Sequence, residues 1–140
     1  MSDVAEAVAF ESEVDTWLAS CYSDPLRYVM GVWTWGKGAL ESSDGPKPWQ
    51  RQFLKDLGVH VKRNAFNGQD PVKPIRRAVS SGHGIGKSVL SAWIVNWIMS
   101  TRPYAQGTVT ANTFTQLQTK TWASIRRWTT ACPRMTWCLS

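Results

Sequence analysis

The chain has 140 residues, of which 43% are hydrophobic, and a formal net charge of +6. This length suits one domain, and a folded chain of this size buries roughly 68–70% of the surface that its unfolded form exposes. The charge is divided unevenly: residues 1–70 carry seven Lys or Arg and all ten Asp or Glu, whereas residues 71–140 carry nine Lys or Arg and no acid. The basic half indicates a polyanionic partner, nucleotide phosphate or nucleic acid, or else an imbalance left by truncation before further acids.

Cysteine usage and hydropathy favour a soluble protein of a reducing compartment. Cys21, Cys132 and Cys138 form an odd set without a zinc-ligand spacing, so free thiols are expected. The acidic N-terminus lacks the basic start of a secretory signal. The longest apolar stretch, 89–99, is shorter than the ~20 residues that a bilayer requires. We therefore expect no membrane partner and a cytoplasmic location.

The first 74 residues predict a helical segment. Apolar spacing indicates a helix over 2–19, and Asp24-Pro25 is typical of a cap and first turn for a second helix towards Trp33. Residues 36–47 are rich in Gly, Ser and Pro and predict a loop. Pro48 opens a third helix that we expect to end at Gly58. Polar, irregular sequence follows, with a possible short strand at Val59-His60-Val61.

The rest of the chain predicts an α/β arrangement. A short strand is expected at 75–80, a buried helix at 87–100, a β-rich run at 107–111 and a further helix at 113–128. Strand, loop, helix, strand and helix in this order indicate the start of a parallel α/β sheet, incomplete in this chain.

Between the first expected strand and its helix lies the run Ser81-Gly82-His83-Gly84-Ile85-Gly86-Lys87-Ser88. It fits the phosphate-binding P-loop pattern G-x-x-x-x-G-K-[ST] at every fixed position but the first, where Ser81 replaces Gly. Glycines let backbone N–H groups surround a phosphate, and the following helix adds its positive end. Lys87 would reach the outer phosphates, and the Ser88 hydroxyl would bind Mg²⁺. The alternative is a Gly-rich turn that precedes a helix by chance.

With the P-loop, three further segments resemble the large terminase subunit of tailed bacteriophages, the viral DNA-packaging motor. They are residues 24–29 (DPLRYV), 48–54 (PWQRQFL) and 109–117 (VTANTFTQL), continued by Lys120-Thr121-Trp122. The similarity extends from Asp24 to Trp128. It implies an ATPase of the helicase-like P-loop class with ATP and Mg²⁺ as cofactors, followed by a nuclease domain. It also implies double-stranded viral DNA, a small terminase subunit and a portal protein as partners, in a bacterial host cell.

Carried over residue by residue, the resemblance assigns ATP and Mg²⁺ to Lys87 and Ser88. Gln50 resembles the adenine-contacting glutamine upstream of the P-loop, with an ordinary exposed helix residue as the alternative. His83 stands where many large terminases have an arginine that acts on the γ-phosphate. A neutral imidazole does this poorly, so His83 is expected to be a structural histidine of the loop.

The chain also departs from the terminase pattern. An apolar strand ending in Asp-Glu, which orders Mg²⁺ and activates water, is missing because no acid follows Asp70, and the nuclease carboxylates are missing too. We therefore expect an N-terminal helical segment (1–58), a partial ATPase core (59–128) and a tail unlike the family (129–140): a truncated ATPase fragment that binds nucleotide without hydrolysing it alone. The alternatives are an NTPase that borrows an acid from a partner, a basic nucleic-acid-binding module, or a non-functional prophage remnant.

Tryptophan is abundant, with nine residues. Trp93 and Trp97 are four residues apart on one helix face and are expected in the core. Trp122, Arg126, Arg127 and Trp128 mix aromatic and guanidinium groups. Such a helix either contacts nucleic acid or is half-buried against a partner surface that the chain lacks.

Overall fold

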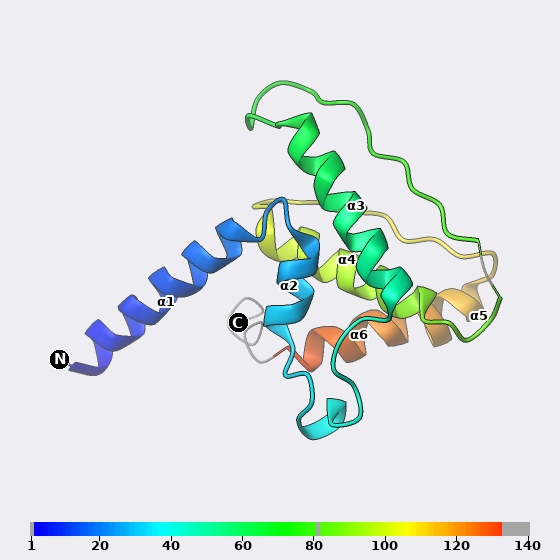
Figure 1. Ribbon diagram of the computed structural model, residues 1–140, viewed down its shortest axis with the longest axis horizontal. Coiled ribbons are helices and arrows are strands. Elements are labelled where there is room, and N and C mark those ends of the chain that lie inside the picture. Colours follow the sequence, from blue (N-terminus) through cyan, green and yellow to red (C-terminus); the bar gives the residue numbers. More distant parts are fainter. Residues whose placement is uncertain (1, 81, 133–140) are drawn as a thin grey trace.

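The computed structural model describes residues 2–80 and 82–132, and every regular element within those ranges is helical (Figure 1). The α-helices are α1 (Ser2–Ser20), α2 (Pro25–Val32), α3 (Pro48–Asn64), α4 (Lys87–Thr101), α5 (Phe114–Gln116) and α6 (Ala123–Thr130). A 3₁₀ turn, η1 (Gly38–Leu40), and a π-helical turn, η2 (Leu117–Trp122), complete them. None of the helices in the described ranges has the length and apolar character needed to cross a membrane.

The expected parallel α/β sheet is wrong for the described part of the chain, which contains no strand. Residues 75–80 and 107–111, the two expected strands, belong instead to irregular segments that are mostly exposed. Two strands make a marginal sheet at best, and parallel strands need a helical crossover that covers their faces. The third expected strand, at Val59-His60-Val61, is part of α3.

The helical expectations for the N-terminal part hold, apart from one boundary. Asp24 caps α2 because its carboxylate accepts a hydrogen bond from the Arg27 backbone N–H at 3.0 Å. The expected end of α3 at Gly58 is wrong, since the helix continues to Asn64. Gly58 is needed for packing: a Cβ there would lie 2.9 Å from the carbonyl oxygen of Ser23, so its missing side chain lets α3 approach the turn before α2.

Helix α4 is the centre of the core. As expected from its sequence, Trp93 and Trp97 are buried, and α4 packs against α1, α2 and α6. The Trp97 indole donates to the Cys21 carbonyl at 2.7 Å. Beyond it, the guanidinium of Arg102 lies over the rings of Trp97 and Tyr22, 4.4 and 4.0 Å from their centroids, where burial lowers its pKa. These contacts fasten the end of α4 to the turn that joins α1 to α2.

Four tryptophans connect α2, the segment after it, α4 and α6. The ring of Trp128 lies 5.2 Å from Trp93, 5.0 Å from Trp33 and 5.8 Å from Trp35, measured between centroids. The pairs of Trp128 with Trp93 and Trp33 meet edge to face, the geometry that aromatic quadrupoles favour. The Trp33 indole also donates to the Trp128 carbonyl at 3.0 Å. This tryptophan cluster attaches the last described helix to the rest of the core.

Buried polar groups join the same helices. Asn96 is 2% exposed, and its side chain donates to the Ala92 carbonyl and accepts from the Thr129 hydroxyl at 2.9 Å. The Tyr28 hydroxyl contacts the Asn96 carbonyl and the Ser100 hydroxyl, at 3.2 and 2.8 Å. Satisfied in this way, the polar atoms fix one register between α2, α4 and α6. Of the three cysteines, Cys21 is a free thiol, Cys21 and Cys132 are buried, and Cys138 lies outside the described residues.

Replacing Trp93 by alanine should lower the free energy of unfolding by about 3–5 kcal/mol, because it empties the middle of the tryptophan cluster. The matched control is Trp122→Ala: this side chain is 49% exposed, so its loss should change stability by less than about 1 kcal/mol. Urea unfolding followed by circular dichroism at low protein concentration measures both. Equal losses for the two variants would contradict the packing described here.

Candidate phosphate-binding loop

Residues 82–86 form a turn that leads directly into α4, whose first residue is Lys87. Gly84 and Gly86 have φ angles of +77° and +97°, in the region that side chains disfavour. The glycines of the motif thus occupy positions where the backbone requires them. The turn also agrees with the sequence prediction that the motif opens a helix, although no strand precedes it within the described residues.

The expected site residues differ in exposure. Gly82, His83, Gly84 and Ser88 are exposed, whereas Ile85, Gly86 and Lys87 are half-buried. A Cβ added at Gly82 or Gly84 would meet nothing within 4 Å, so the outer side of the turn is open. Farther into α4, the Ser88 carbonyl accepts a hydrogen bond from the Ser124 hydroxyl at 3.2 Å, which ties the helix start to α6.

Gln50, at the start of α3, is brought to the loop although 36 residues separate it from Gly86. Its side-chain nitrogen donates to the Gly86 carbonyl at 3.0 Å, and its side-chain oxygen accepts from the Lys47 backbone N–H at 2.8 Å. The side chain is 3% exposed, so it is a buried connector and not an ordinary exposed helix residue. The adenine contact implied by the terminase resemblance stays a prediction.

The contact between Gln50 and Gly86 is tight. A Cβ on Gly86 would come within 2.7 Å of the Gln50 side-chain nitrogen and would displace that amide, and the positive φ angle of Gly86 also favours glycine. The contact between Gln50 and Lys47 has a local signal in the sequence. Pro48 occupies the first helical position, and a glutamine at the third position can accept a hydrogen bond from the backbone N–H of the residue before the helix. The contact with Gly86 has no such local signal, because it depends on how α3 packs.

Three aspartates have partners away from the loop. Asp56 pairs with Arg77 at 3.2 Å, Asp24 caps α2, and Asp70 accepts from the Asn67 side chain at 2.7 Å. Within the described residues, no three His, Cys, Asp or Glu side chains gather in a way that would hold a metal ion. The arrangement around the loop brings together backbone N–H groups, Lys87 and the Ser88 hydroxyl, which suit binding of an anion.

Comparison of the chain with known protein families, with curated proteins and with solved structures gave no match.

Replacing Gln50 by alanine should lower the free energy of unfolding by about 1–3 kcal/mol, because it leaves the Lys47 N–H and the Gly86 carbonyl without their partner. Gln52→Ala is the matched control: Gln52 lies on the same helix, and its amide bonds only to Asp56 at an exposed position. Chemical unfolding of both variants makes the comparison. A Gln50→Ala protein as stable as Gln52→Ala would argue against the buried contact.

Proposed function

We propose that residues 82–88 bind the phosphates of a nucleotide, and that this chain carries the nucleotide-binding part of a terminase-like DNA-packaging ATPase. The observation that carries the proposal is the positive φ of Gly84 and Gly86 in a turn that matches the P-loop motif and opens α4. The proposal concerns this loop and helix and involves no parallel sheet.

The residues of the loop fit a bound polyphosphate. The first turn of an α-helix presents backbone N–H groups that have no acceptor within the helix, and its positive end favours an anion. Gly86, the cap residue of α4, brings no side-chain oxygen to compete for them. Above Gly82 and Gly84 the space is open, so a phosphate can approach the backbone. Lys87 would balance the phosphate charge, and the Ser88 hydroxyl would be a ligand of the accompanying Mg²⁺.

Binding without hydrolysis by the isolated chain is the expected activity. Mg²⁺ shields the phosphates of a bound nucleotide, but hydrolysis also needs a base or an oriented water. All ten acids of the sequence precede residue 71, and three of them already cap, pair or stabilise a turn. Duplex DNA, a small terminase subunit and a portal protein are proposed partners on the terminase resemblance alone.

Lys87→Ala should weaken ATP binding by about 10- to 100-fold, because a hydrogen bond to a charged group contributes roughly 1.5–3 kcal/mol. Titration calorimetry with Mg²⁺ and ATP measures the dissociation constant. Lys62→Ala, an exposed lysine of α3, is the control and should bind as the unchanged chain does.

Three ligands separate phosphate recognition from other contacts. ATP and inorganic triphosphate should both bind, whereas adenosine, which lacks phosphate, should bind much more weakly. Equal affinity of the Lys87→Ala and unchanged chains for ATP would refute the phosphate-binding loop. Release of phosphate by the purified chain, abolished by Lys87→Ala, would favour a complete NTPase.

A further inference from the structure

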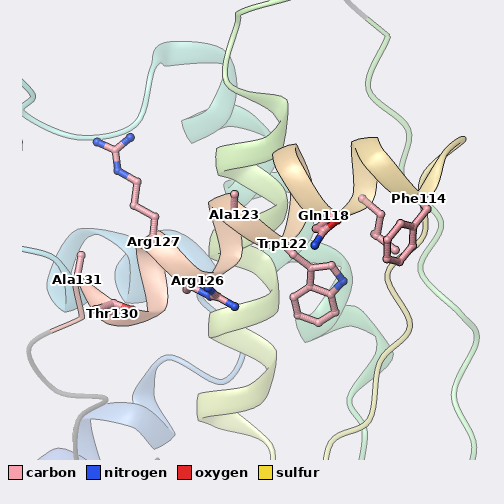
Figure 2. A pocket seen from close by; sticks show the side chains of 9 residues that line it. Phe114, Gln118, Trp122, Ala123, Arg126, Arg127, Thr130 and Ala131 are labelled. Atoms are coloured by element: carbon pink, nitrogen blue, oxygen red, sulfur yellow. The ribbon is translucent and has the colours of Figure 1, made fainter.

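The outer surface of α5, η2 and α6 is an open groove that combines apolar and basic side chains. It has a volume of about 740 Å³, and its lining includes Phe114, Leu117 and Trp122 towards one end and Arg126 and Arg127 towards the other. Figure 2 shows Trp122 and Arg126 projecting from neighbouring turns, with Arg127 pointing in a different direction. Phe114 is 77% and Trp122 49% exposed. So large an aromatic surface in a basic setting indicates a binding site for an apolar, acidic partner.

The first half of α1 has the complementary character. Residues 3–13 are all exposed to solvent. They include two apolar side chains, Val4 and Val8, which are 68% and 59% exposed. Glu11 and Asp15 follow them at intervals that place all four side chains on one helix face, at i, i+4, i+7 and i+11. No lysine or arginine occurs before Arg27. This acidic arm, residues 3–15, therefore presents two valines followed by two carboxylates.

We propose that the acidic arm of one molecule docks in the groove of a second copy of this chain. Val4 and Val8 would cover Phe114, Leu117 and Trp122. Glu11 and Asp15 would then lie beside Arg126, which projects on the same side as Trp122. Charge complementarity is the argument for this occupant, because the arm has no base and residues 114–131 have no acid.

The spacing of the two surfaces agrees with this pairing. At 1.5 Å per helical residue, the centre of the valine pair is about 10 Å from the centre of the carboxylate pair. On the groove, the middle of the apolar part, halfway between Phe114 and Trp122, is about 12 Å from Arg126 by the same measure. A parallel arrangement of arm and groove therefore brings both kinds of contact into register at once.

The arm of the same molecule is held away from its own groove. Figure 1 shows the N-terminal end of α1 projecting from the body on the side opposite to α5. At its other end α1 is fixed, since the Trp17 ring stacks on Tyr28 with centroids 6.1 Å apart. A second molecule meets the groove without breaking this contact. Reciprocal exchange of arms closes a two-fold dimer, and one-way docking extends a chain of molecules.

Sedimentation velocity of the full chain over a range of concentrations tests the proposal. We expect concentration-dependent association that weakens with added salt. Val8→Asp in the arm and Arg126→Glu in the groove should each raise the dissociation constant about tenfold or more, through lost apolar burial and through charge repulsion. Val59→Asp is the matched control, because Val59 is 52% exposed on α3, away from both surfaces, and this variant should associate normally.

A charge exchange makes the test specific. Arg126→Glu combined with Glu11→Arg should recover at least part of the association that each single change removes. Circular dichroism spectra and melting curves of the variants, compared with Val59→Asp, exclude loss of folding as the cause.

Two results would overturn the proposal. One is a chain that stays monomeric at every concentration, including a monomer that binds labelled duplex DNA through Arg126, which would make the groove a nucleic-acid surface. The other is association that Arg126→Glu abolishes and Val8→Asp leaves unchanged, because the arm would then not be the occupant.

Discussion

Packing of tryptophan rings on α4 is the interaction on which the rest of this structure depends. Trp93 lies between Trp33, Trp35 and Trp128, which come from the end of α2, the segment after it and α6. In a chain with no described strand, no ladder of backbone hydrogen bonds links distant segments. Side-chain contacts must do this, and large rings provide the most buried area per residue. The position of α4, and with it the loop that opens α4, follows from this cluster.

The local signals in the sequence identified the helices well. The Asp24-Pro25 cap, Pro48 at the start of α3 and the apolar α4 all have counterparts in the structure. Such signals depend on neighbours within a few residues. Gly58 predicts a helix end, but in the structure it serves packing against Ser23, a contact between distant segments that neighbouring residues do not reveal. The sheet failed for the same reason: extended, β-rich residues form strands only where other strands are present to pair with them.

The glycine turn of the candidate site could be predicted from the sequence, but the contact with Gln50 that holds the turn could not. Glycines before a helix, followed by Lys and Ser, indicate a backbone that curls around an anion, and Gly84 and Gly86 have the required φ angles. The sequence points to Gln50 for a different reason, its resemblance to an adenine-contacting glutamine. In the structure its amide joins the first turn of α3 to Gly86. The first turn of α3 therefore stabilises the start of α4, and the stability of α3 is linked to the geometry of the loop.

The long irregular segments have a consequence for the covalent chain. Residues 65–80 are almost entirely exposed and include two consecutive arginines, Arg76 and Arg77. An ion pair between Arg77 and Asp56 connects this segment to α3. Trypsin should therefore cut here before it cuts within the helices. The fragments before and after the cut contact each other through the tryptophan cluster, the Gln50–Gly86 hydrogen bond and the Tyr28–Asn96 hydrogen bond. None of these contacts depends on an intact connecting peptide. A nicked molecule would hold together as a complex of two fragments, and the same division offers a natural point for producing the halves as separate polypeptides.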